Sequence, residues 1–268
     1  MKLSRGVLGL PLLMLAFAVT ITKRDERRPS LLFRKAQLLE RSGSLQQAAR
    51  AYNRLISQYP GTPAACRALW ELASMEYSVI QDAEKAVGLF HNLVDSCRGE
   101  ELVGHAMLMI ADIYELDLRD LEQSNQIRRE YLELVSDSER SHETLFKIGD
   151  VLFKQGKYVE AQAYFEHLLE LEPEEEIATP ANLRIGTILQ IGQDYDRSIP
   201  YFYSVIERSR SPEFRLQARL GLIESYELLD KLSRSLEIAR EIRPDEYPAQ
   251  LKNDMLMRLS QKKKHFAR

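Results

Sequence analysis

The sequence predicts an all-α solenoid of about six helix hairpins, with an N-terminal apolar segment before it and a C-terminal capping helix after it. Three observations support this fold class. Glycine and proline are sparse, 12 and 10 among 268 residues, while helix-favouring Leu, Glu, Arg, Ala and Gln recur. Small residues return at a fixed spacing along the chain. Apolar residues within each repeat follow the i, i+3, i+4, i+7 spacing of an amphipathic helix.

The first 28 residues differ from the rest of the chain. Lys2 and Arg5 precede an uncharged stretch over 6–22, and four basic residues follow it. This stretch is close to the short limit of a membrane span, for which about 20 apolar residues are needed. Its Ala-Phe-Ala at 16–18 also fits a signal-peptide cleavage site. Residues 1–28 are therefore predicted to be either a cleaved signal peptide or an N-terminal membrane anchor with a basic flank.

Two columns of small residues define the repeat. Within each column the spacing is 37 or 38 residues, and both columns keep it across six units. Such self-similarity is the mark of a repeat architecture. The first column is Ala48, Ala86, Ser124, Ala161, Ser198 and Ser235, and the second is Ala36, Ser74, Ala111, Gly149, Gly186 and Ile223. The predicted units lie near 29–62, 67–100, 104–138, 142–175, 179–212 and 216–249.

The fourth unit, 142–175, shows the predicted hairpin best. An apolar-periodic helix is followed by Gly156, which permits the positive φ that a turn needs, and then by a second periodic helix. Gly149 and Ala161 are small enough for the two helices to approach closely, and Phe165 fills the space beside them. The unit therefore predicts two antiparallel helices.

These residues resemble the tetratricopeptide-repeat (TPR) family over about 29–249. Unit one supplies Ala36, Leu39, Gly43, Leu45, Ala48, Tyr52, Leu55 and Pro60; unit two Trp70, Ser74, Tyr77, Ala83, Ala86, Phe90 and Leu93; unit five Ile185, Gly186, Leu189, Tyr195, Ser198, Phe202 and Val205. Units three and six depart from the pattern, with Arg128 and Ala239 where the family has Phe. The period exceeds the family's length of about 34 residues by roughly one helical turn. Longer helices are therefore expected where units join.

A final amphipathic helix is predicted within 250–268. Leu251, Met255, Leu256 and Leu259 are spaced to share one face, and a basic tail follows. A solenoid needs a cap over its last apolar face, and this helix is the candidate.

No enzymatic site is predicted. The chain has no glycine-rich phosphate loop, no His-Glu-x-x-His, no Cys-x-x-Cys and no nucleophile elbow, and its five histidines lack metal-ligand spacing. No cofactor or metal is expected. The charge pattern, basic ends around an acidic body, disfavours nucleic acid, because its phosphates demand a basic surface.

The resemblance implies that the first helices of the hairpins line a concave groove for protein partners. Phe146 and Phe153, two turns apart on one helix, are the expected apolar anchors, and Asp112 and Asp150 are expected to add negative charge. The partner is predicted to be a segment with apolar anchors and basic flanks. The alternative is that several groove residues only pack between hairpins. The predicted groove residues are Phe33, Gln37, Glu71, Met75, Leu108, Asp112, Phe146, Asp150, Phe153, Lys154, Leu183 and Gln190; the same helix faces also include Arg41, Val79, Glu115, Thr187, Leu220 and Glu224.

Two cysteines remain. In the repeat frame Cys66 starts the first helix of unit two and Cys97 ends the second, so both lie at one pole of the hairpin. An oxidising compartment would permit a disulfide. Two separately buried thiols are the alternative.

Segments such as 57–65 resemble TPR proteins of bacterial envelopes, which implies a non-enzymatic scaffold of an envelope complex. The expected location is periplasmic or anchored in the inner membrane, with membrane contact through the N-terminal segment if that segment is not cleaved. The alternative is an anchored adaptor on the cytoplasmic face of a membrane, which the four basic residues after the apolar stretch favour slightly.

Overall fold

A computed structural model describes residues 27–134, 138–243 and 245–266. All regular secondary structure in these ranges is helical, without a strand, which confirms the predicted all-α class. No helix in the same ranges is both long and apolar enough to cross a membrane. The predicted signal peptide or anchor lies outside the described residues, apart from its last two.

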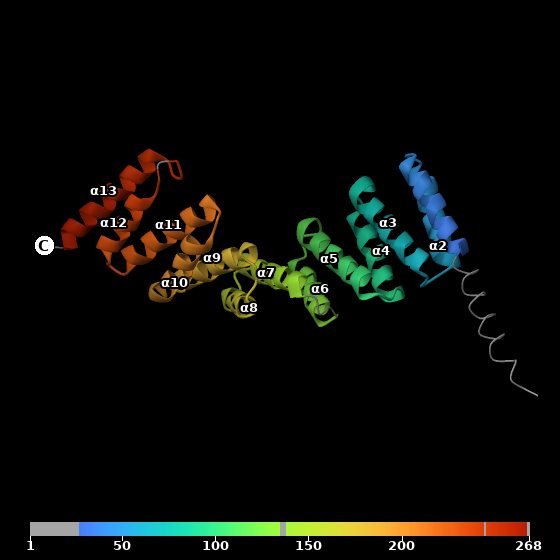
Figure 1. The fold of residues 1–268 in the computed structure, drawn as a ribbon, viewed down its shortest axis with the longest axis horizontal. Coiled ribbons are helices and arrows are strands. Elements are labelled where there is room, and N and C mark those ends of the chain that lie inside the picture. Colours follow the sequence, from blue (N-terminus) through green and yellow to red (C-terminus); the bar gives the residue numbers. More distant parts are fainter. Residues whose placement is uncertain (1–26, 135–137, 244, 267–268) are drawn as a thin grey trace, which may run out of the picture. The chain divides into compact units, whose positions relative to one another are not determined.

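The chain divides into two compact units, Met1–Val135 and Ser136–Arg268, and each holds three hairpins (Figure 1). The described part of the first unit begins with a helix over 27–41 and continues with α2 (Leu45–Gln58), α3 (Pro63–Met75), its π-helical extension η1 (Glu76–Ile80), α4 (Ala83–Ser96), α5 (Glu100–Leu116) and α6 (Leu121–Leu134). The second unit contains α7 (Ser138–Lys154), α8 (Tyr158–Glu170), α9 (Glu175–Ile191), α10 (Tyr195–Arg208), α11 (Pro212–Leu228), α12 (Leu232–Glu241) and α13 (Ala249–Phe266).

The lengths of the helices explain the long repeat period. The first helices α5, α7, α9 and α11 each have 17 residues, whereas the second helices α8 and α10 have 13 and 14. The predicted extra turn is therefore present in the first helix of these hairpins.

Every hairpin turns through one residue of positive φ. Only two of these residues are glycine, so four hairpins place a side chain in a backbone region that L-residues occupy at a cost of about 1–2 kcal/mol. The turn geometry therefore recurs although the turn sequence does not. The residues are Gly43, Gln81, Arg119, Gly156, Gln193 and Asp230.

Close approach of the two helices in a hairpin depends on a glycine facing an aromatic ring. A Cβ added at Gly149 would lie 2.7 Å from Phe165 Cε1, and one at Gly186 would lie 2.7 Å from Phe202 Cε1. Both rings are buried. The predicted pairing of small and aromatic residues is therefore the contact that holds these hairpins together.

The third hairpin replaces the ring by a buried cation. The guanidinium of Arg128 is enclosed between α5 and α6, and its Nη2 lies 2.7 Å from Asp112 Oδ1 and 2.8 Å from Glu115 Oε2. Its Nη1 donates to Ser124 Oγ at 2.7 Å. A buried charge is tolerated when it is paired and hydrogen-bonded, which explains how this degenerate repeat keeps the fold.

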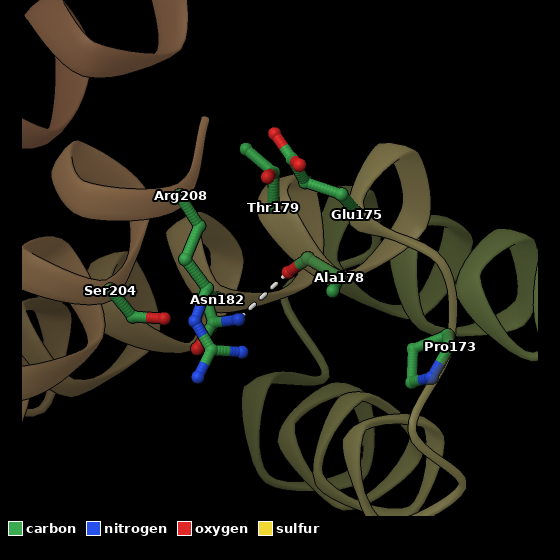
Figure 2. A pocket seen from close by; sticks show the side chains of 7 residues that line it. All are labelled: Pro173, Glu175, Ala178, Thr179, Asn182, Ser204 and Arg208. Atoms are coloured by element: carbon green, nitrogen blue, oxygen red, sulfur yellow. Dashed lines mark hydrogen bonds between the residues drawn. The ribbon is translucent and has the colours of Figure 1, made fainter. Parts of the chain in front are cut away.

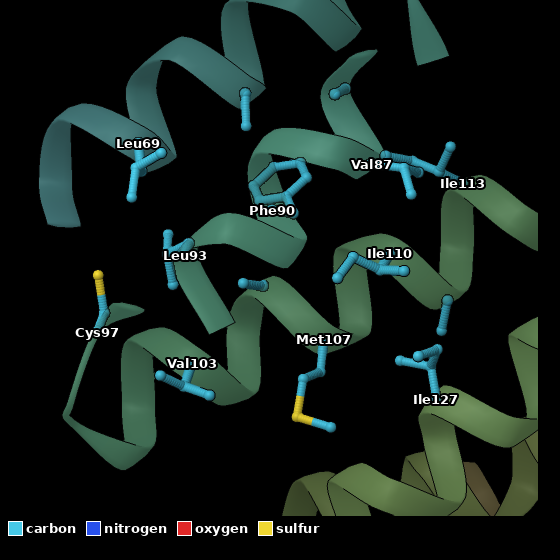
Figure 3. Packing of buried hydrophobic residues seen from close by; sticks show 14 of the residues in the cluster. Leu69, Val87, Phe90, Leu93, Cys97, Val103, Met107, Ile110, Ile113 and Ile127 are labelled. Atoms are coloured by element: carbon cyan, nitrogen blue, oxygen red, sulfur yellow. The ribbon is translucent and has the colours of Figure 1, made fainter. Parts of the chain in front are cut away.

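The second hairpin carries a disulfide between Cys66 and Cys97, whose Cα atoms are 5.8 Å apart. Separately buried thiols, the alternative that the sequence left open, are thus not what the structure contains. The bridge joins two residues that are 31 apart in the sequence. Because it restricts the unfolded chain, it contributes about 3.5 kcal/mol to stability. Around it, Leu69 of α3, Phe90 of α4 and Ile110 of α5 belong to one buried cluster (Figure 3).

The last helix, α13, covers the second unit's final hairpin, as predicted for a cap. Leu259 is fully buried, and Met255 and Leu256 pack beside it against α11 and α12. Leu251, which the spacing placed on the same face, is exposed instead. Lys252 explains part of this orientation, because its Nζ donates to the carbonyls of Arg240 and Ile242 at the end of α12.

Adding one methyl group should distinguish the two kinds of helical glycine. Gly186→Ala is expected to lower stability by about 1–3 kcal/mol, because its Cβ collides with the Phe202 ring. Gly88→Ala is the control: its Cβ meets nothing within 4 Å, and replacement of a helical glycine should stabilise by roughly 0.5–1 kcal/mol. Urea unfolding followed by circular dichroism measures both. Equal effects would contradict the close-approach argument.

Candidate partner-binding face

An exposed residue recurs in the last turn of the first helices. It lies five positions after the second column of small residues, which runs from Ala36 to Ile223. Four of the six residues at this position are large and apolar: Val79, Leu116, Ile191 and Leu228, which are 55, 57, 48 and 49% exposed. Ile191 and Leu228 belong to the second unit and end α9 and α11, while Val79 and Leu116 belong to the first. Recurrence at one register position makes these residues a defined surface in each unit.

The predicted groove set omits Leu116, Ile191 and Leu228. The signal for them is in the sequence, because 37 residues separate Val79 from Leu116 and Ile191 from Leu228. An amphipathic pattern assigns apolar residues to the core by default, so exposed ones at the same spacing are overlooked.

Beside this position in α7 lies the predicted anchor Phe153. Its ring meets that of Tyr158 edge-on at 5.5 Å, and the Arg184 guanidinium of α9 lies 4.7 Å from its centroid. Phe153 is half-buried, so part of the residue remains exposed. The cation–π contact joins α7 to α9 and fixes the ring in place.

Asp150 is surrounded by cations. Arg184 reaches its Oδ1 with Nη2 at 2.7 Å and Nε at 2.9 Å, and Lys154 Nζ lies 3.0 Å from its Oδ2. Both cations belong to the second unit, as Asp150 does. The expected negative charge at Asp150 is therefore absent from the second unit's face, because neighbouring residues of the same unit neutralise it.

Three predicted groove residues lie in the core instead. Met75 is 2% exposed, and Phe33 and Leu183 are also buried. Arg67 further covers Phe33, with its Cζ 5.2 Å from the ring centroid. A ligand has little access to these three side chains, and the alternative that they pack between helices applies to them.

Other predicted groove residues make contacts between neighbouring helices and are partly exposed. Phe146 packs on Phe165 at 5.5 Å, and Leu108 packs against the first unit's core. Gln190 Nε2 donates to the Gly221 carbonyl at 2.8 Å and to Ser225 Oγ at 2.9 Å, which links α9 to α11. These residues position the face more than they offer binding groups.

In the first unit, negative charge gathers at Glu40 and Glu71. Gln37 Nε2 donates to Glu71 Oε1 at 3.3 Å, and the Tyr52 hydroxyl donates to Glu40 Oε2 at 2.6 Å. Partial burial and the charge of Glu40 raise the pKa of Glu71 above its ordinary value. Burial and the same hydrogen bond raise the pKa of Tyr52. Within the described residues neither carboxylate forms an ion pair, unlike Asp112, which Arg128 holds.

Two segments match models of the tetratricopeptide repeat, residues 29–72 and 142–175. No curated protein matches the chain by sequence. Among solved structures, YrrB, described as a TPR protein with an unusual peptide-binding site, aligns with TM-score 0.56 and 17% identity over 80% of this chain and 99% of its own.

Two further structures show the same fold. BtubC from P. vanneervenii has TM-score 0.53 and 13% identity over 83% of this chain and 92% of its own. PilF of Pseudomonas aeruginosa has TM-score 0.50 and 13% identity over 88% of this chain and 98% of its own. Likeness at these identities establishes the fold and nothing about ligands.

Glu71→Gln should stabilise the protein at pH 7. Folding raises the pKa of the Glu71 carboxyl, so its ionisation costs more in the folded than in the unfolded state. The protein therefore loses stability as the pH rises from the unfolded-state pKa through the folded-state pKa. The variant should therefore unfold at a higher temperature than the parent at pH 7, and the gain should vanish at pH 4. Exposed Glu133→Gln is the control. A gain of equal size at both pH values in a thermal melt would refute the argument.

Proposed function

We propose that this chain, a tetratricopeptide-repeat protein, is a non-enzymatic scaffold of a bacterial cell envelope complex that binds partner segments on its first helices. The exposed apolar residues at the ends of these helices carry the proposal. Single exposed apolar residues need no explanation, but these four recur at one register position, and we take that recurrence to mark an interaction surface. That YrrB, a protein of the same fold, has a peptide-binding site supports a peptide-like ligand.

The charges of the two units suit different parts of the partner segment. Glu40 and Glu71 in the first unit suit a lysine or arginine next to an apolar anchor. In the second unit the cluster of Asp150, Lys154 and Arg184 does not suit a basic flank, and Phe153 supplies the apolar contact there. We infer a segment whose basic residues bind the first unit.

The disulfide supports an envelope location for the helical body. Structural disulfides persist in oxidising compartments such as the periplasm and are rare in the cytosol. Cys66 and Cys97 form such a bridge between α3 and α4. The alternative, a cytosol-facing adaptor, retains the support of the basic residues after the N-terminal apolar stretch.

Thiol trapping in intact cells separates these locations. Cells are quenched in acid, and the denatured protein is treated with a maleimide-polyethylene glycol before and after reduction. In the periplasm Cys66 and Cys97 should resist modification until they are reduced. Cys66→Ala is the control, since its remaining thiol should react at once. Modification of both thiols without reduction would favour the cytosol-facing adaptor.

Site-specific photo-crosslinking tests the binding face. A photoreactive residue at Ile191 or Leu228 should capture the same partner, because both sites end first helices of the second unit. Val159 of α8 is the control, since it is 85% exposed but lies on a second helix. Adducts at Val159, with none at the other two sites, would move binding away from the first helices.

A further inference from the structure

The helix over 27–41, at the start of the first unit, buries one side and exposes the other. On the buried side, Phe33 and Ala36 belong to a core cluster with residues of α2 and α3. The exposed side is called the outer face here. It is defined by five exposed residues whose spacing places them together on one side of the helix: Arg27, Leu31, Arg34, Lys35 and Leu38. The proposed binding of segments at helix ends does not use it.

The two leucines of the outer face occupy positions that other hairpins bury. Ala106 and Ile113 hold the corresponding positions in the third hairpin, five before and two after the small residue of the repeat. Both are fully buried in a cluster with residues of α3 and α4, the hairpin before theirs. Leu31 and Leu38 are instead 66 and 60% exposed, because no hairpin precedes theirs in the described residues. The apolar end of a solenoid needs a cover, and here the described chain supplies none.

The charge around these leucines is positive. The exposed charged residues of the helix are all basic, namely Arg27, Arg28, Arg34, Lys35 and Arg41. The one acid of the helix, Glu40, is partly buried and accepts a hydrogen bond from the Tyr52 hydroxyl at 2.6 Å. Within the described residues, the three cations of the outer face form no ion pair. A ligand for this face must therefore carry negative charge and also accept two leucine side chains.

The surface of an anionic membrane meets both requirements. Helices with basic residues beside leucines lie in the plane of the interface, with the apolar side chains in the boundary between headgroups and acyl chains. The long side chains of Arg34 and Lys35 can keep their charges among the headgroups while Leu31 and Leu38 insert. A second copy of the outer face is disfavoured as the cover, because it would bring cations against cations.

The place of the helix in the chain agrees with a membrane contact. The uncharged stretch of the predicted anchor ends at residue 22, and the helix begins at residue 27. A chain of five residues spans at most about 18 Å, so an anchor in the bilayer would hold the start of the helix at the membrane surface. Basic residues beside an anchor are attracted by anionic lipids over about a Debye length.

We propose that the outer face of the helix over 27–41 binds the surface of a membrane that contains anionic lipids. Leu31 and Leu38 enter the boundary between headgroups and acyl chains. Arg27, Arg34 and Lys35 pair with the anionic headgroups. Lipid then covers the end of the first unit that a preceding hairpin would otherwise cover.

Tryptophan quenching on the full chain tests this contact. The Leu31→Trp variant is reconstituted into vesicles of phosphatidylcholine brominated near the top of its acyl chains, with or without one third phosphatidylglycerol. The new tryptophan should be quenched about twofold more in the anionic vesicles. The predicted anchor is present in both kinds of vesicle, so the difference separates binding of the face from tethering alone. The parent, whose only tryptophan is Trp70, supplies the baseline.

A second position controls for nonspecific contact with lipid. Leu116→Trp places the tryptophan at a residue that is also exposed, by 57%, but that ends α5, two hairpins away in the same unit. Its quenching should match that of the parent in both kinds of vesicle. Equal quenching at the two positions would overturn the proposal. So would an absence of quenching at Leu31→Trp in anionic vesicles, which would favour an acidic protein surface as the cover.

Matched charge variants test the recognition of anionic lipid. In the Leu31→Trp chain, Arg34→Gln combined with Lys35→Gln should reduce quenching in anionic vesicles to the level in phosphatidylcholine alone. Two cations near such a surface contribute about thirtyfold to its affinity. Arg98→Gln combined with Arg119→Gln is the control, since it removes the same charge from exposed positions elsewhere in the first unit. Equal losses in the two double variants would contradict a site on the outer face.

Discussion

The distance between the two helices of a hairpin is the constraint on which the repeats depend. Gly149 and Gly186 admit the rings of Phe165 and Phe202 where a Cβ would leave less than 3 Å. The Phe202 ring also lies against Gly221 of the following hairpin, so a single side chain sets contacts within and between repeats. Because each repeat must satisfy the same contact, the first helices present equivalent positions at their ends. The core thus fixes the positions at which the exposed apolar residues recur.

The third repeat shows how far the constraint can be relaxed. Arg128 occupies the aromatic position, and two carboxylates of α5 compensate its charge. Removal of a single partner from such a buried group typically costs 3–5 kcal/mol, much more than loss of a surface pair. The same pairing withdraws Asp112 and Glu115 in part from ligand binding. Core and surface chemistry are thus coupled in this repeat, whereas in the fourth and fifth repeats the core is apolar.

The sequence predicted the helices well, because both the repeat period and the apolar spacing are read over many residues at once. It predicted the face less well, since an apolar stripe does not reveal which of its edges meets another helix. Met75 and Leu183 are buried for this reason, while Ile191 at the helix end is exposed. The net charge of the face was harder still to predict. The sequence shows that Asp150 is acidic, but its partner Arg184 lies 34 residues away. Pairs between repeats appear only when the hairpins are stacked.

Repeat architecture makes such differences informative. Two repeats with the same backbone should have the same local needs, so a group present in one and missing in the other calls for a physical reason. Glu246 pairs with Arg219 in the sixth repeat, whereas the fifth repeat has Asn182 at the position of Arg219, and its amide donates to the Ala178 carbonyl instead (Figure 2). Comparison of the chain with itself therefore shows that equivalent positions can be satisfied by different internal partners, a long-range ion pair in one repeat and a local hydrogen bond in the other.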